Sequence, residues 1–147
     1  MPRIAELTPK MYVAIELLEN AIDAYFRAAY FAAIQLAGGA EEIFGKYIAR
    51  VSPSDNAFAS LKNFAVELAG PSNEKERLVL GKAIGDRMTY ARNRTKHINQ
   101  TGDDDILFDP VLEAKDLLDR AVTDYYHLMN YFSLPESDLL RRFNSLK

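Results

Sequence analysis

A chain of 147 residues with 48% hydrophobic and 27% charged residues has the length and composition of one globular domain. It contains no cysteine, which excludes a disulfide scaffold and a thiolate metal site and fits a reducing cytosol. Its net charge of -3 argues against a general nucleic-acid coat protein. The sequence has neither an apolar run long enough to span a bilayer nor the apolar core of a signal peptide, so we expect a cytoplasmic protein with no membrane partner.

The first third of the chain carries apolar residues at helical spacing, and Thr8 followed by Pro9 is typical of a helix N-cap and first helical position. The pattern continues to Val51 without a further proline. One unbroken helix of that extent would be about 64 Å long, far beyond the radius of gyration of about 15 Å expected for a domain of this size. A break is therefore required, either at residues 26–29 or at residues 38–39.

Three further helices and a short tail helix follow, each bounded by turn-forming residues. They are predicted at residues 55–69, 74–97, 110–132 and 135–143. In the first two, the apolar side chains expected to face the core are Phe58, Leu61, Phe64, Ala65 and Leu68, then Leu78, Leu80, Ala83, Ile84, Met88 and Ala91. No segment alternates with the period of a strand. The sequence therefore predicts an all-α bundle of four to five main helices plus a short C-terminal helix, in a single domain over residues 1–147.

The predicted helix over residues 30–51 is rich in alanine and glycine, whose small size lets another helix approach closely. Glu41 and Glu42 lie in this segment. We expect one of them to be a solvated surface residue and the other to be a structural partner, for example of a neighbouring arginine. Neither is given a catalytic role.

Residues 90–97, YARNRTKH, concentrate one of the two histidines, three cationic side chains and an asparagine. An arginine, an amide and a histidine in that order suit chemistry on a phosphodiester, as a fixed cation, an orienting hydrogen bonder and a proton carrier. The alternative is a basic, solvated helix end, because cations in a last turn complement the helix dipole. The residues by themselves favour this alternative.

Arg92, Asn93 and His97 reproduce the R-x4-6-H motif, with a polar residue directly after the arginine, that is typical of the HEPN family of all-helical nucleotide-binding and ribonuclease domains. Residues 30–45, YFAAIQLAGGAEEIFG, also resemble the second helix of bacterial members. The resemblance covers most of the chain and implies a HEPN-like helical bundle, with the first of the two helix breaks considered above. It further implies a homodimer, in which motifs from two subunits face one another across a cleft, and a metal-independent endoribonuclease without a cofactor.

Each residue of the motif has a role under this resemblance. His97 takes the proton of a ribose 2′-hydroxyl, whose oxygen attacks the adjacent phosphorus, while Arg92 stabilises the charge that develops there and Asn93 orients His97 or the phosphate. Arg94 and Lys96 would grip flanking phosphates of the RNA. A dimer is favoured because Arg92 and His97 diverge by about 140° around an ideal helix, so that one copy of the motif makes a poor active site.

Two alternatives stay open beside the ribonuclease. One is a noncatalytic dimeric HEPN module that binds a nucleotide or a protein partner. The other is a toxin or phage-defence protein controlled by an antitoxin. Family toxins that pair with nucleotidyltransferase antitoxins resemble R-x4-H-x-Y, and Asn99 occupies the position of that tyrosine. This difference argues against regulation by modification of the tyrosine.

The sequence lacks the motifs of the common metal-binding sites. A di-iron bundle needs two acid-x-x-His motifs, and the chain has only Asp124 with His127. The acidic run at residues 103–105 lacks the ligand spacing of an EF-hand. We therefore expect no metal site, and we interpret His127 as a partly buried helix residue with a hydrogen-bond partner.

Overall fold

The computed structural model describes residues 5–97 and 104–146. Within these residues the chain forms seven α-helices and no β-strand, which confirms the predicted all-α class. The helices are α1 (Lys10–Phe26), α2 (Tyr30–Val51), α3 (Ala57–Leu68), α4 (Glu74–Met88), α5 (Tyr90–Lys96), α6 (Pro110–Leu128) and α7 (Asp138–Asn144).

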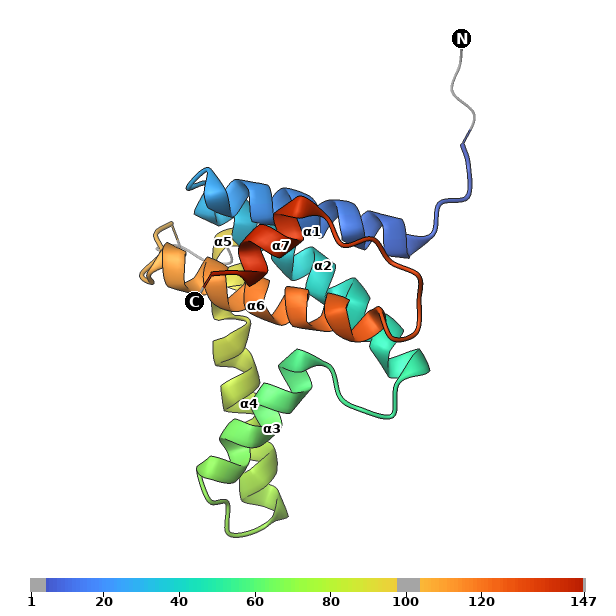
Figure 1. Cartoon of the computed structure of the whole chain (residues 1–147). Coiled ribbons are helices and arrows are strands. Elements are labelled where there is room, and N and C mark those ends of the chain that lie inside the picture. The colour runs from blue at the N-terminus through green and yellow to red at the C-terminus, as the bar shows by residue number, and fades with distance from the viewer. Residues whose placement is uncertain (1–4, 98–103, 147) are drawn as a thin grey trace.

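Helices α1, α2, α6 and α7 pack together as the main bundle (Figure 1). Their apolar faces meet in one large core, whose fully buried side chains include Leu18, Ile22, Phe44, Leu117, Leu118, Tyr125, Leu128 and Leu140. A second cluster of small buried side chains holds the short helix α5 against α2 and α6, and comprises Ala24, Ala33, Ile34, Ala91 and Ala114. The core therefore positions the helix that carries the HEPN-like motif.

The chain reverses direction between α1 and α2 at residues 27–29. Ala28 adopts a φ of 61°, in the left-handed region, and the N–H of Ala29 donates to the carbonyl of Ala24 at 2.8 Å. Helix α2 then continues through residues 38–39 without interruption. The first of the two predicted breaks is therefore the one the chain uses.

Helix starts follow ordinary capping chemistry, but two predicted starts need correction. The tail helix begins at Asp138, three residues after the predicted start at Pro135. Asn73, Asp109 and Ser137 each accept a hydrogen bond from a backbone N–H in the first turn of α4, α6 and α7. At α1 the predicted cap is wrong, because Pro9 has an extended ψ of 137° and is itself the N-cap residue. Thr8 lies outside the helix and makes no capping hydrogen bond.

The fourth predicted helix, residues 74–97, is two helices rather than one. Thr89, with φ of -100° and ψ of 1°, ends α4 and precedes α5, and its Oγ1 donates to the carbonyl of Gly85 at 3.1 Å. A threonine hydroxyl that bonds the preceding turn competes with the regular helix ladder. The change of direction at Thr89 lets α5 pack on α2 while α4 leaves the bundle.

Helices α3 and α4 form a hairpin, here called the α3–α4 arm, that projects from the bundle (Figure 1). The expectation that its apolar residues face the core is wrong for Leu61, Phe64, Leu68, Leu78 and Ala83, which are exposed. Val66 is the only buried residue of α3, and α4 has none. The two helices pack on each other and touch α6 only near the base of the arm, so their apolar faces exceed what the fold covers.

Two further expectations concern the polar loop before the fifth predicted helix and the absence of a membrane span. The predicted polar loop over residues 99–105 falls largely outside the described residues, as does Asn99. Across the described ranges, none of the helices combines the length and the apolar character that crossing a bilayer requires.

Candidate functional site

The side chain of Arg92 crosses the backbone of α2 at Gly38. A Cβ atom at Gly38 would lie 3.1 Å from Arg92 Cγ, still closer to Arg92 Cδ, and 3.3 Å from a methyl carbon of Leu117. Arg92 Nη1 lies 3.5 Å from the Gly38 carbonyl oxygen, at the limit of a hydrogen bond. Arg92 is half-buried in this position, so the glycine provides the space that the guanidinium stem occupies.

Gln35 of α2 joins this helix to α5 through hydrogen bonds. Its Nε2 donates to the backbone carbonyl of Arg92 at 2.9 Å and also to Thr95 Oγ1. Thr95 Oγ1 in turn donates to the carbonyl of Ala91 at 2.8 Å. The sequence reasoning missed Gln35, although a lone glutamine in an alanine-rich helix is a polar residue that needs a partner when buried.

His97 ends α5 and faces solvent. It is the C-cap residue, with an extended backbone (φ -121°, ψ 138°), and its N–H donates to the carbonyl of Asn93 at 3.2 Å. Asn93 is also exposed, with Nδ2 3.5 Å from Thr89 Oγ1. Among the described residues, Arg92, Asn93 and His97 share no side-chain hydrogen bond, so the three predicted catalytic groups are not joined to one another within the chain.

The two residues predicted to grip phosphates differ in their surroundings. Arg94 is half-buried, and its Nη2 donates to the backbone carbonyl of Asp105 at 3.2 Å, which ties α5 to the segment before α6. Lys96 is exposed. Arg94 thus has a structural role within the chain, while Lys96 has the accessibility that a phosphate contact requires.

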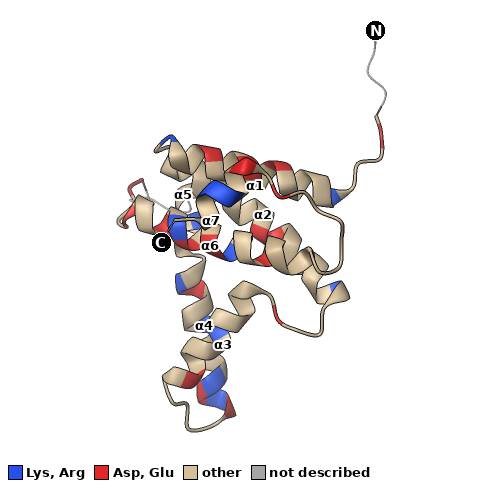
Figure 2. Ribbon diagram, in the orientation of Figure 1, with Lys and Arg blue, Asp and Glu red and all other residues tan. Residues whose placement is uncertain are grey.

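A groove of about 410 Å³ opens beside Arg92. Arg92 and Lys46 bring positive charge to it, Glu41 and Glu42 bring negative charge, and Asn56 and Thr89 bring polar groups. His97 is not among its lining residues. In the view of Figure 2, acidic and basic residues are interspersed over both the bundle and the arm, so any attraction for a phosphate would come from individual cations such as Arg92 and not from a broad positive field.

A buried ion pair lies beneath this groove. Arg120 Nε donates to Glu41 Oε2 at 2.5 Å, and Arg120 Nη2 donates to the carbonyl of Met88 at 3.2 Å. Both side chains are buried, and the guanidinium also lies 5.7 Å from the ring centre of Phe58. The pair joins α2, α6 and the end of α4. With Glu42 exposed, it confirms the expectation that one of the two glutamates is a structural partner and the other a solvated surface residue.

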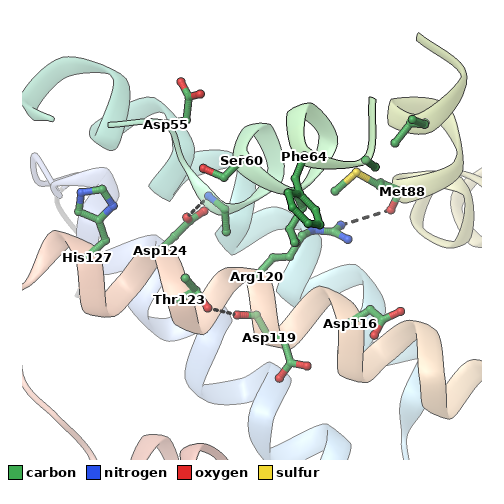
Figure 3. A pocket seen from close by; sticks show the side chains of 14 residues that line it. Asp55, Ser60, Phe64, Met88, Asp116, Asp119, Arg120, Thr123, Asp124 and His127 are labelled. Carbon is green, nitrogen blue, oxygen red and sulfur yellow. Dashed lines mark hydrogen bonds between the residues drawn. The ribbon is translucent and has the colours of Figure 1, made fainter. Parts of the chain in front are cut away.

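A second and larger cavity, of about 800 Å³, lies between α6 and the α3–α4 arm (Figure 3). Asp124 lines it and is buried, and its Oδ1 accepts a hydrogen bond from the Ala57 N–H at 2.8 Å. Burial raises the pKa of Asp124 to about 6, although the bond from Ala57 acts in the opposite direction. His127 is half-buried and lies 2.9 Å from Ser52 Oγ, which confirms the expectation for that histidine.

The sequence reasoning considered Asp124 only as part of an incomplete di-iron motif with His127, and it did not find this cavity. A signal was present, because polar residues recur on one face of α6 at intervals of three or four positions. They are Asp116, Asp119, Arg120, Thr123, Asp124 and His127. Such a stripe beside the apolar stripe of the same helix indicates a lined cavity or a solvated face, and tertiary contacts decide between the two.

The described geometry defines an all-α protein with a polar groove beside the short helix α5 and an acid-lined cavity at the base of a projecting arm. In comparisons with known proteins, no family model, no curated protein and no solved structure matches the chain. The similarity to the HEPN family therefore rests on residues 90–97 and 30–45, and it stays a prediction.

Proposed function

We propose that the chain is a HEPN-like, metal-independent endoribonuclease that acts as a homodimer. The observation that supports this most is the arrangement of Arg92, which is held half-buried over Gly38 while its side chain lines an open groove. A cation placed in this way is preorganised for a phosphoryl group, because its stem is fixed before substrate binds. A solvated helix end would not require a glycine beneath its arginine.

The dimer accounts for the separation of the three motif residues. In the protomer, Arg92 faces α2 while Asn93 and His97 face solvent at the end of α5. A second protomer docked on α5 would place its own exposed His97 near the Arg92 groove of the first. Two imidazoles would then share one cleft, with a base and an acid drawn from different subunits.

The proposed reaction needs only these groups. One His97 takes the proton of the ribose 2′-hydroxyl, and the 2′-oxygen forms a bond to phosphorus. The bond from phosphorus to the 5′-oxygen breaks, and the second His97, protonated beforehand, donates a proton to that leaving oxygen. Arg92 stabilises the negative charge on the phosphorane, and Asn93 orients the imidazole or the phosphate. The products are a 2′,3′-cyclic phosphate and a 5′-hydroxyl end, while Lys96 and Arg94 would contact flanking phosphates.

The test is cleavage of structured and single-stranded RNAs by the wild-type chain in excess chelator. We expect cleavage in chelator, and a loss of about 100-fold or more in His97→Ala, because general acid–base catalysis is worth that much. His97 is exposed, so the substitution should leave the fold intact. His127→Gln is the matched control, since it changes the other histidine, which lies on a different helix, and should leave cleavage unchanged.

Cleavage that stops when metal is chelated would contradict the proposed mechanism. Equal activity of wild type and His97→Ala would contradict the assignment of the site. The chemical form of the ends gives an independent check, because a 5′-phosphate product excludes attack by the 2′-hydroxyl.

A noncatalytic dimeric module that binds a nucleotide or a protein partner is the second candidate, and the α3–α4 arm favours it. Leu68 and Leu78 on the arm are 72% and 67% exposed, which is the character of a docking surface rather than of a solvated hairpin. A partner such as an antitoxin or a nucleotidyltransferase would cover such a surface. Intact RNA in all assays, together with nucleotide binding to the wild-type chain, would favour this candidate.

A further inference from the structure

We infer that the cavity between α6 and the α3–α4 arm is a binding site for a small organic cation, a protonated amine carried on an apolar body. The inference does not depend on the ribonuclease proposal, because it concerns a different cavity, lined by different residues. Its volume of about 800 Å³ lies in the range of small-molecule sites.

The two walls of the cavity differ in character. Leu61 and Phe64 of α3, with Ile84 of α4, provide an apolar wall, and Figure 3 shows Phe64 projecting from the arm toward α6. The opposite wall is the polar face of α6, from which Asp124 and Arg120 project toward the arm. A ligand here would place hydrocarbon on one side and a polar group on the other.

The charge of the polar wall is negative. Four aspartates line the cavity, at positions 55, 116, 119 and 124. The one lining cation, Arg120, is already bonded to Glu41 and to a backbone carbonyl. Lys115 pairs with Asp119, whereas no cation within residues 5–97 and 104–146 forms an ion pair with Asp116 or Asp124. An anionic ligand would be repelled and a cationic one attracted.

Asp124 supplies the observation that points to a donor from outside the chain. Asp124 is 1% exposed, and its Oδ1 accepts a hydrogen bond from the Ala57 N–H. Its other oxygen, Oδ2, is buried and has no hydrogen-bond partner among the described residues. Buried carboxylate oxygens are normally satisfied, and leaving one unpaired is costly. An ammonium group at the inner end of the cavity would donate to Oδ2 and neutralise the charge.

The chemistry of the ligand follows from these contacts. The ammonium would bind at Asp124, with the charge of Asp116 at the rim adding attraction, and the apolar body would lie along Leu61, Phe64 and Ile84. Burial of Asp124 raises its pKa, and a bound cation would lower it again, so that ligand binding and ionisation of Asp124 support each other.

The experiment is an NMR titration of the full chain, which follows backbone amide shifts with 4-phenylbutylamine as the probe. Uncharged 4-phenylbutanol and anionic 4-phenylbutyrate have the same apolar body and serve as matched ligands. We expect the amine to shift the amides of Ala57, Asp124 and Ile84, with a Kd on the order of millimolar. The alcohol should bind about tenfold more weakly, and the carboxylate should not bind.

Two variants test the assigned contact. Asp124→Asn should weaken amine binding about tenfold while leaving alcohol binding unchanged. Asp116→Asn, at an exposed position where folding is not at risk, should weaken the amine about threefold and is the readout if Asp124→Asn unfolds. Asp23→Asn, on the exposed face of α1 and paired with Arg27, is the control that should change nothing.

Three outcomes would overturn the inference. The first is equal affinity for the amine and the alcohol, which would show an apolar cavity without recognition of charge. The second is amine binding that neither Asp124→Asn nor Asp116→Asn weakens. The third is the absence of shifts at the cavity at millimolar amine.

Discussion

At residue scale, the contact between Gly38 and Arg92 links a feature of α2 to the proposed chemistry. The glycine has no Cβ, and Arg92 occupies the volume where one would stand. Glycine inside a helix costs about 1 kcal/mol relative to alanine. Its presence at position 38 is therefore explained by the arginine above it rather than by the stability of α2.

Gly38→Ala tests this contact. The new methyl group would displace the Arg92 side chain, so we expect a loss of about 1–2 kcal/mol in the free energy of unfolding and a loss of RNA cleavage of about tenfold or more. Urea unfolding and the cleavage assay measure the two effects. Gly81→Ala is the matched control, since its nearest neighbour is a Val66 methyl at 4.0 Å, and it should be neutral or stabilising. If Gly38→Ala and Gly81→Ala had the same free energy of unfolding, the Arg92 side chain would move away from the new methyl group without cost.

Asp124 is the second residue whose surroundings make a measurable prediction. Its pKa is about 6 in the folded protein, against an ordinary value of about 4 in the unfolded chain. The folded state therefore holds the proton more tightly, which stabilises the fold fully below about pH 4. This contribution is lost as the pH rises through about 6.

Comparing the wild type with Asp124→Asn isolates that contribution, because other groups titrate equally in both. We expect the free energy of unfolding of the wild type to fall relative to that of the variant by about 2 kcal/mol between about pH 4 and about pH 7.5. Urea unfolding at a series of pH values measures the difference. If the difference in the free energy of unfolding between wild type and Asp124→Asn stayed constant with pH, the pKa of Asp124 would not be raised in the folded protein.

At the scale of elements, the α3–α4 arm shows that apolar residues at helical spacing need not be buried. Both helices have the spacing of an amphipathic helix, yet they pack mainly on each other and meet the polar face of α6 at residues 116–127. A two-helix hairpin can bury only a narrow strip between its helices. The remaining apolar side chains stay exposed, and an exposed apolar patch of this kind is the feature on which the second candidate function rests.

Leu68→Ser, on the arm, should change the free energy of unfolding by less than about 0.5 kcal/mol, because the leucine is 72% exposed. Leu117→Ala, in the main core, should cost about 2–5 kcal/mol, since that side chain is 1% exposed. Thermal or urea unfolding of both variants checks the contrast. A large cost for Leu68→Ser in the isolated protomer would show that the arm folds back on the bundle.

At the scale of the whole molecule, the Glu41–Arg120 pair joins the parts of the fold. It connects α2 with α6 and reaches the carbonyl of Met88 at the point where the arm returns to the bundle. Both groups are buried, so each depends on the other for compensation of its charge. Glu41 also lines the groove beside Arg92, so this junction lies next to the proposed site.

Arg120→Met leaves the Glu41 carboxylate buried without its partner and should cost about 3–5 kcal/mol in the free energy of unfolding. The double variant Glu41→Leu with Arg120→Met removes both charges and should recover most of that loss. Urea unfolding of the single and double variants forms the comparison. A double variant no more stable than the single would show that the cost is lost packing and not an uncompensated charge.

Local sequence was enough to predict most of the helices. The starts of α4 and α6 follow from Asn73 and Asp109, whose side chains accept backbone N–H bonds within the same turn. The single-helix prediction over residues 74–97 was wrong at Thr89, because a threonine is compatible with a helix interior and only packing on α2 favours the bend. Whether Arg92, Asn93 and His97 act as a site stays a prediction.

By itself, the sequence determined the all-α class and the starts of α4 and α6, because hydrophobic period and capping act over a few residues. Only the tertiary structure decided which apolar faces are covered and which polar groups meet. Gln35 bonds Arg92 across 57 positions, Ala57 bonds Asp124 across 67, and Glu41 pairs with Arg120 across 79. Such partners are chosen by the packing of whole helices, which no local pattern contains.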